Sequence, residues 1–291
     1  MKDGKLGAYT LIKNEVPWIG YCVMAARHAV SEFVYYDGNS DDGTIEILEY
    51  LRDKKGVNIK LYKNKDPKNL QDDYVRMFNE ALSQLRTMFA MFLHPDMIVT
   101  DGNWSPVDGP LAYTVKMDSY AGDPQGPLHR FAAGRTDRWK NIMKNSLGLH
   151  YHGHYGAANE DTYFREITGD EHEMHTEPKD YPYGVGDSGL RLAHYSDVRP
   201  YARRLGRMLS CLRNQHPGMP DINYQEYAKV HPRVTFEPHR TYPGFKFERT
   251  GDVPEVFELH AEELADLLGK RVEDVCYLPL SAKAKEAANV G

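Results

Sequence analysis

The chain has 291 residues, of which 41% are hydrophobic and 11% aromatic, which predicts one α/β domain with an appendage rather than two large domains. Its formal net charge of −6 argues against a protein that binds nucleic acid or anionic membranes nonspecifically. Its three cysteines form no metal-type pair, and neither a secretory segment nor an apolar run near the roughly 18 residues of a spanning helix is visible. We therefore expect a cytoplasmic protein whose only membrane contact is peripheral.

The first hundred residues alternate between β-prone runs and amphipathic stretches. Strands are predicted at 6–12, 32–36, 57–62, 88–93 and 97–99, and helices at 16–30, from 44 onward and at 71–86. This order is typical of a mostly parallel, Rossmann-like sheet with helices on both faces. The sequence therefore predicts the α/β fold class.

The pattern is less regular after residue 100. Strands are predicted at 111–117 and 190–195, whereas the segment around Tyr163 fits the end of a helix or the start of a strand. From residue 199 the composition shifts: a basic amphipathic helix is predicted around Arg203 to Arg213, and an acidic helix at 261–270. We expect a domain at 1–198 and a mainly helical extension at 199–291.

Two polar segments follow predicted strands. His94-Pro95-Asp96 ends the apolar run at 88–93, because proline cannot donate to a sheet ladder. Ligands of open α/β sheets bind at the carboxyl ends of strands, and an imidazole and a carboxylate there can bind a divalent cation. The alternative is a plain turn. The second segment, 37–44, is a tight loop in which Asp41 or Asp42 can cap the helix that begins near Thr44.

Three stretches together resemble a known family. They are LIKNE at 11–15, YDGNSDDGT at 36–44 and LHPD at 93–96. These are similar to the successive signatures of the family 2 glycosyltransferases of GT-A fold. The resemblance covers residues 6 to 100 well and continues more loosely to about 200.

The resemblance implies a nucleotide-sugar donor site. It implies that Asp37 contacts the nucleobase, with Asn39 in the same loop, and that the turn formed by Lys13, Asn14 and Glu15 lines the pocket. The alternatives are that Asp37 only forms an Asx turn and that Glu15 is only an early-helix acid.

A helical stretch of the family has a weaker counterpart in this chain. Arg76 and Asn79 resemble its Arg-Asn-x-Ala-Leu stretch, but two residues separate them here. The resemblance adds Arg76 to the expected donor site.

The family also implies a metal site. Asp96 matches the last acid of its Asp-x-Asp motif, where this chain has His94 in place of the first acid. An imidazole suits Mn²⁺ better than Mg²⁺, although either cation is expected. His194 in Ala193-His194-Tyr195 is a further expected ligand. The alternative is that Asp96 alone holds the cation and His94 bonds the donor.

The expected catalytic base is a carboxylate that removes the acceptor proton. Downstream segments resemble the branch that builds bacterial lipopolysaccharide cores, which assigns this role to Glu173. Asp161 competes, because Glu160-Asp161 resembles the Glu-Asp pair of other members. A solvated surface acid is the alternative for either residue.

Three alternating histidines could form a second metal site, although no acid completes it. They are His150, His152 and His154.

We therefore expect a metal-dependent, inverting hexosyltransferase that uses a UDP-sugar and an acceptor hydroxyl of a glycan or lipopolysaccharide. A hydroxylated DNA base is an alternative acceptor, although the acidic charge makes nucleic acid the less favoured partner. A noncatalytic nucleotide-sugar-binding relative is a second alternative. A nucleotidyltransferase is a third, but residues 6–15 contain one glycine and no phosphate loop.

Overall fold

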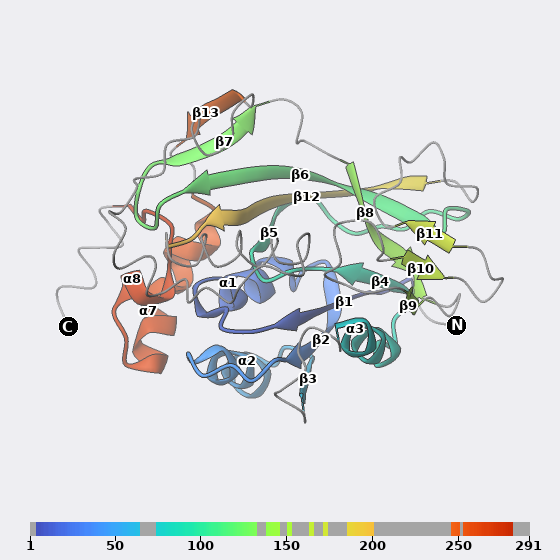
Figure 1. Ribbon diagram of the computed structural model, residues 1–291, viewed down its shortest axis with the longest axis horizontal. Coiled ribbons are helices and arrows are strands. Elements are labelled where there is room, and N and C mark those ends of the chain that lie inside the picture. Colours follow the sequence, from blue (N-terminus) through green and yellow to red (C-terminus); the bar gives the residue numbers. More distant parts are fainter. Residues whose placement is uncertain are drawn as a thin grey trace, which may run out of the picture.

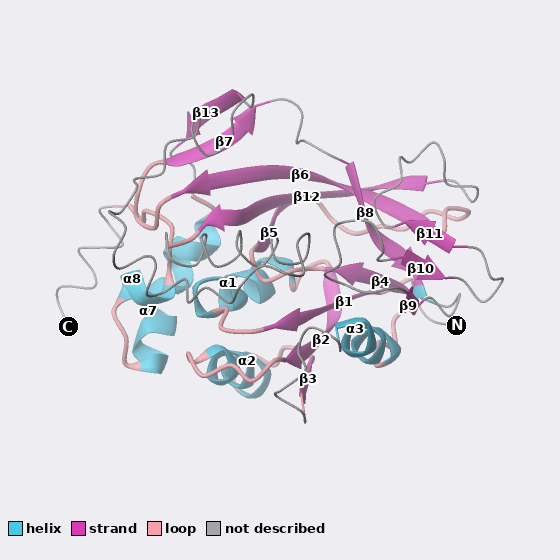
Figure 2. Ribbon diagram, viewed as in Figure 1, coloured by secondary structure: helices cyan, strands magenta, loops and turns pink. Residues whose placement is uncertain are grey.

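The computed structural model describes residues 4–64, 74–132, 138–145, 150–152, 163–165, 171–173, 185–200, 246–250 and 253–281. These residues form a ten-stranded mixed sheet, flanked by helices, and a separate three-stranded sheet (Figures 1 and 2). The α/β class predicted from the sequence is confirmed.

Four parallel strands form one end of the large sheet in the order β3-β2-β1-β4, with β3 at the edge. Their bounds are β1 Leu6–Ile12, β2 Val30–Asp37, β3 Ile59–Lys63 and β4 Phe89–Phe92. The helices between them are α1 Val16–Ala26, α2 Thr44–Asp53 and α3 Tyr74–Ser83. Because parallel strands require crossover connections, this β-α-β order follows directly from the alternating sequence pattern.

Side chains of these parallel strands alternate between two apolar layers. On β1, Ala8 packs with the α1 and α2 residues, whereas Tyr9 packs with the α3 residues. On β2, Tyr35 and Val34 divide in the same way. Successive side chains of a strand point to opposite faces, so these apolar runs require helices on both sides of the sheet.

Beyond β4 the sheet is extended mainly by antiparallel pairs. β8 (Arg138–Lys144) joins β4 to β6 (Ala112–Gly122), and β6 also pairs with β7 (Leu128–Ala132), which pairs with β13 (Lys246–Thr250). β12 (Val185–Val198) runs parallel to β6 and antiparallel to β5 (Met97–Asp101). The long strand β12 therefore returns to the segment that follows β4.

The smaller sheet contains β9 (His150–His152), β10 (Tyr163–Arg165) and β11 (Glu171–Glu173). Tyr163 thus begins a strand, and the helical alternative for this segment is wrong. Helix α1 ends at Ala26, short of the predicted residue 30, because Val30 already pairs with Leu6 in the sheet.

The C-terminal helices α7 (Glu255–Leu268) and α8 (Val272–Val275) pack on α1 and belong to its apolar core. Gly20 permits this approach, since a Cβ there would lie 2.6 Å from Cδ1 of Leu264. The acidic helix begins six residues before its predicted start, immediately after Pro254, which suits a helix start. The basic segment at 203–213 lies outside the described residues, and the boundary at 198 stays a prediction.

Within the described ranges, no helix combines the length and the apolar character needed to cross a membrane.

Candidate functional site

The carboxyl ends of β1, β2 and β4 bring the predicted polar segments to one edge of the parallel sheet. Lys13 to Glu15 follow β1, the loop at 37–44 follows β2, and His94 to Asp96 follow β4. Because all three strands run in the same direction, their polar ends lie together. This is the edge at which the sequence predicted a ligand site.

The first two segments are joined by hydrogen bonds between backbone and side chains. The amides of Asn14, Glu15 and Val16 donate to Ser40 Oγ (3.0 Å), Thr44 Oγ1 (2.8 Å) and Asp42 Oδ2 (3.2 Å), respectively. Asn14 has a φ of 57°, a conformation that asparagine tolerates better than most residues. The turn after β1 is therefore held against the loop after β2.

The expectation that Asp41 or Asp42 would be the N-cap of α2 is wrong, because Gly43 holds that position. Asp42 nevertheless bonds to the first turn of this helix. Its Oδ1 accepts a hydrogen bond from the Thr44 amide at 3.0 Å, while its other oxygen accepts from Val16 at the start of α1. One carboxylate thus serves the first turns of two helices, where backbone N–H groups lack helical partners.

Asp37 is almost completely buried, and Ser40 occupies both of its oxygens. The Ser40 amide lies 3.1 and 3.2 Å from Oδ1 and Oδ2, and its hydroxyl donates to Oδ1 at 2.6 Å. The backbone bond reaches three residues along the chain, one further than the Asx turn that the sequence analysis kept as an alternative, but it is a local turn of the same kind. Asn39, between the two residues, is exposed with a φ of 64°. Contact of Asp37 with a nucleobase stays a prediction.

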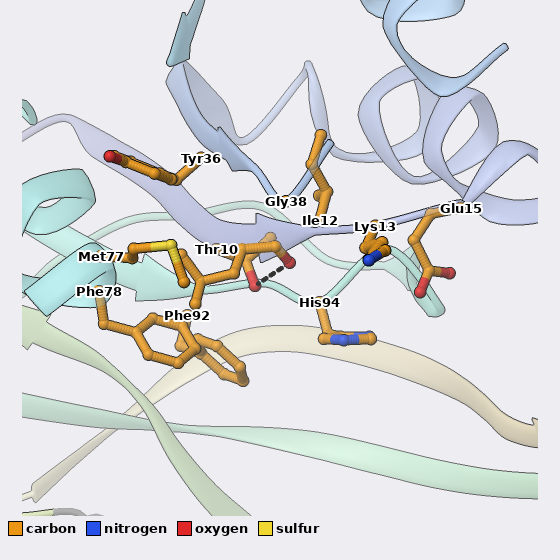
Figure 3. A pocket seen from close by; sticks show the side chains of 11 residues that line it. Thr10, Ile12, Lys13, Glu15, Tyr36, Gly38, Met77, Phe78, Phe92 and His94 are labelled. Carbon is orange, nitrogen blue, oxygen red and sulfur yellow. Dashed lines mark hydrogen bonds between the residues drawn. The ribbon is translucent and has the colours of Figure 1, made fainter. Parts of the chain in front are cut away.

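A cavity of about 210 Å³ opens beside this turn. Its lining residues come from β1, β2, α3 and the end of β4: Thr10, Leu11, Ile12, Lys13, Glu15, Tyr36, Gly38, Met77, Phe78, Phe92 and His94. Figure 3 shows the ring of Phe92 beside Met77 and Phe78 on one side, and Lys13, Glu15 and His94 on the other. The cavity thus has an apolar end and a polar end. Three of the predicted site residues line the polar end.

Next to the polar end, Asp96 is the centre of a charged cluster. His94 Nδ1 lies 2.6 Å from Asp96 Oδ1, and His194 Nε2 lies 3.5 Å from the same oxygen. The other oxygen, Oδ2, accepts a hydrogen bond from Arg199 at 2.7 Å. The same Arg199 nitrogen is 3.5 Å from Glu15 Oε2. The cluster therefore connects the ends of β1, β4 and β12.

The charges of the cluster shift the pKa values of its members. Burial alone would raise the pKa of Asp96, but His94 and His194 beside it lower that pKa well below its usual range. Burial alone would lower the pKa of His94, but the neighbouring Asp96 outweighs burial and raises it. The pKa of Arg199 is also raised, because Glu15 and Asp96 outweigh the effect of burial. Asp96 and Arg199 are therefore charged at neutral pH.

Strand β12 brings His194 to this edge. His194 pairs with Met97 across the antiparallel β5–β12 ladder, and the next amide, that of Tyr195, donates to the Asp96 carbonyl at 2.9 Å. The ring of Tyr195 stacks on Trp18 of α1 with a centroid distance of 5.4 Å. His194 therefore sits on a strand that is fixed by both ladder and core contacts.

Arg199 is the site residue that the sequence analysis missed. It directly follows β12, just as Asp37 ends β2 and Asp96 follows β4. Its position at the end of a strand was the sequence feature that could have marked Arg199 as a site residue. The pairing with Asp96 was not predictable, because 103 residues separate the two.

The arrangement does not fit a divalent cation. Two ligands of one octahedral ion at about 2.1 Å lie roughly 3 Å apart, whereas His94 and Asp96 approach to 2.6 Å, the separation of a hydrogen bond. The second oxygen of Asp96 is engaged by Arg199. No group of three or more histidine, cysteine or acidic side chains suited to a metal occurs among the described residues.

Other predicted residues lie at the margin of this site or outside it. Arg76 is exposed and pairs with Glu80 at 2.6 Å. Its neighbours Met77 and Phe78 line the cavity. Arg76 also lies close enough to Tyr36 to oppose the rise in the pKa of Tyr36 that burial causes. Arg76 thus lies at the rim, and Asn79 on the same helix is not among the lining residues.

Of the two predicted bases, only Glu173 lies among the described residues, and it is not among those described as lining the cavity. Glu173 ends β11, which Figure 1 draws at the other end of β4 from His94 and Asp96. Asp161 and His154 lie outside the described residues, and His150 and His152 are placed only as backbone of β9. Their roles stay predictions.

No known family profile matches this chain, and no curated protein matches it. Among solved structures, it is 15% identical to residues 1–349 of TarS from S. aureus in complex with UDP, over 50% of each chain, with a TM-score of 0.36. The chain thus spans about half the length of the TarS structure that it matches.

Two further matches are also distant. The mannosyltransferase PcManGT from Pyrobaculum calidifontis, in complex with GDP-Man and Mn²⁺, is 15% identical over 38% of this chain and 35% of that one, with a TM-score of 0.28. GalNAc-T7 with UDP, GalNAc and Mn²⁺ is 11% identical over 98% of this chain and 54% of that one, with a TM-score of 0.39. Similarity at this level assigns no activity to this chain.

Proposed function

We propose that this chain is a glycosyltransferase of the GT-A type that binds a nucleotide-sugar donor at the carboxyl edge of its parallel strands. The observation that carries the proposal is the cavity between the ends of β1 and β4, with an apolar end, a polar end and a charged cluster beside it. The three sequence stretches that resemble family 2 glycosyltransferases lie at this same edge.

The two ends of the cavity suit the two chemical parts of a nucleotide. Phe78, Phe92 and Met77 offer apolar surface to a flat base, and aromatic side chains favour such stacking. Lys13 at the opposite end offers a cation to phosphate oxygens. The volume of about 210 Å³ is below the roughly 300–1,000 Å³ of typical ligand sites, so the cavity suits only part of a donor.

The finer features of the reaction extend this proposal. In an inverting transfer from a UDP-hexose, an acceptor oxygen forms a bond to the anomeric carbon while the bond to the diphosphate breaks. A carboxylate takes the acceptor proton. The family resemblance alone gives Glu173 for that role, with Asp161 as the competitor, and Glu173 lies on β11 rather than among the residues described as lining the cavity. A glycan or lipopolysaccharide hydroxyl is the proposed acceptor.

Calorimetric titration with UDP, GDP, CDP and dTDP tests donor binding. We expect one nucleotide to bind, and Lys13→Ala and Phe78→Ala to weaken it at least tenfold, because they change opposite ends of the cavity. Lys54→Ala is the matched control, since Lys54 is exposed at the end of α2 and does not line the cavity. Failure of all four nucleotides to bind the wild-type protein would contradict the proposal.

A further inference from the structure

Arg199 is a buried arginine that faces two carboxylates. It is 9% exposed, and its guanidinium lies 2.7 Å from Asp96 Oδ2 and 3.5 Å from Glu15 Oε2. Asp96 and Glu15 are themselves 0% and 7% exposed. A buried charge is tolerated only when an opposite charge and hydrogen bonds compensate it, so Arg199 compensates the negative charge of this edge.

The position of Arg199 conflicts with a cation on Asp96. A divalent cation bound to a carboxylate oxygen would lie within a few ångströms of the guanidinium already bonded to that carboxylate. Like charges at such a separation repel strongly in a buried, weakly screened environment. The second carboxylate, Glu15, holds Arg199 at this place. Binding of a cation would therefore require Arg199 to leave both acids.

The cluster adjoins the polar end of the cavity. Glu15 and His94 line the cavity and also contact Arg199 or Asp96. A diphosphate placed there would meet the negative charges of Glu15 and Asp96 if nothing compensated them. Guanidinium groups are well suited to sites that hold carboxylates and phosphates together, because their charge is permanent and they donate in a planar fork.

We propose that Arg199 takes the place of a divalent cation in this chain. It offsets one of the two negative charges of Asp96 and Glu15 and places a fixed positive charge beside the end of the cavity that receives a diphosphate. The second part rests on the proposed donor site, whereas the competition between Arg199 and a cation for Asp96 does not. Arg199 is thus a charge-compensating residue rather than a catalytic one.

Titration with Mn²⁺ alone, followed by electron paramagnetic resonance, tests the competition without any nucleotide. Up to about 1 mM, we expect the wild-type protein to show no Mn²⁺ site that Asp96→Asn abolishes. We expect Arg199→Met to create a site at least tenfold tighter, and the double variant Arg199→Met/Asp96→Asn to lose it. Arg191→Met is the matched control: Arg191 is an arginine of the same strand that pairs with Asp118 at 2.6 Å, and its loss should create no site.

Wild-type Mn²⁺ binding that Asp96→Asn abolishes would overturn the proposal. This comparison needs only the wild-type protein and Asp96→Asn, so it decides the matter even if Arg199→Met does not fold. Melting curves followed by circular dichroism establish which variants are folded.

A second titration connects Arg199 to the donor site. With the nucleotide that binds best, we expect the wild-type dissociation constant to change less than twofold between EDTA and Mn²⁺. Arg199→Met should weaken binding at least tenfold in EDTA, and Mn²⁺ should restore part of the loss. Loss of wild-type nucleotide binding in EDTA would overturn the role of Arg199. If no nucleotide binds under either condition, the proposed function is contradicted. The Mn²⁺ titration still tests whether Arg199 and a cation compete for Asp96.

Discussion

Two buried aspartates at neighbouring strand ends are stabilised in different ways. Asp37, at the end of β2, and Asp96, just after β4, are 1% and 0% exposed. Asp37 takes its hydrogen bonds from Ser40, three residues further along the chain. Asp96 combines a local partner, His94, with His194 and Arg199, which are about a hundred residues away.

The difference shows that similar burial can serve different purposes. The hydrogen-bond donors to the Asp37 carboxylate are uncharged hydroxyl and amide groups, and these bonds shape a loop. The Asp96 cluster brings charges from three strand ends together, so its energy depends on the whole sheet being assembled. We therefore expect the same substitution to have unequal effects at the two positions.

The largest effect is expected for Asp96→Asn. It removes the charge that compensates buried Arg199, so the free energy of unfolding should fall by about 3 kcal/mol. Asp37→Asn keeps an oxygen acceptor for Ser40 and should cost about 1 kcal/mol. Urea unfolding of both variants measures the difference. Equal losses would show that the long-range charges add nothing beyond local hydrogen bonding.

A smaller effect is expected for Ser40→Ala. The Ser40 hydroxyl donates to Asp37 and accepts from the Asn14 amide, so its removal should cost about 1–2 kcal/mol of unfolding free energy. Ser83→Ala is the control, because the exposed Ser83 hydroxyl makes only local bonds, to the Glu80 carbonyl and from the Gln84 side chain. A loss no greater than that of the control would mean that the two loops are held by other contacts.

Glu263 separates the effect of long-range partners from that of burial. It is bonded to Tyr50 and Lys55 of another segment, but its side chain is 30% exposed. Burial alone would raise the pKa of Glu263, but hydrogen bonds from Lys55, Tyr50 and His260 lower it to about 2. Because the folded pKa is below the ordinary 4.5, its stabilisation is present above pH 4.5 and is lost as pH falls toward 2.

Glu263→Gln should therefore cost about 1 kcal/mol near neutral pH, since solvent screens part of the interaction. The difference from wild type should vanish toward pH 2. Thermal unfolding between pH 2 and 7 measures this. A loss as large as that of Asp96→Asn would show that distance along the chain, rather than burial, sets the energy.

The smallest effect is expected for the pH dependence of His94. Its pKa is raised above the ordinary value of 6.5, so its stabilisation of the folded protein is complete below pH 6.5 and is lost as pH rises through the folded pKa. The gap in unfolding free energy between wild type and His94→Gln should narrow from pH 6 to pH 9. A gap that widens with pH would show that the neutral imidazole is the stabilising form.

The local chemistry of the strand ends was predictable from the sequence. The turn at Asp37 and the bond between Asp42 and the start of α2 involve partners two or three residues away, and such bonds form within one turn. The cavity was predictable in part. Lys13 and His94 carried a local signal, whereas Met77 and Phe78 lie within the helix predicted at 71–86 and carried no signal of a ligand site.

By itself, the amino-acid sequence determined the alternation of strands and helices, the two-sided covering of the parallel strands and their polar ends. These properties follow from hydrophobic periodicity and turn chemistry, which act over a few residues. Only the tertiary structure decided that Arg199 meets Asp96. That pairing depends on the register of β12 against β5 and β6, which is set by contacts between segments far apart in the chain.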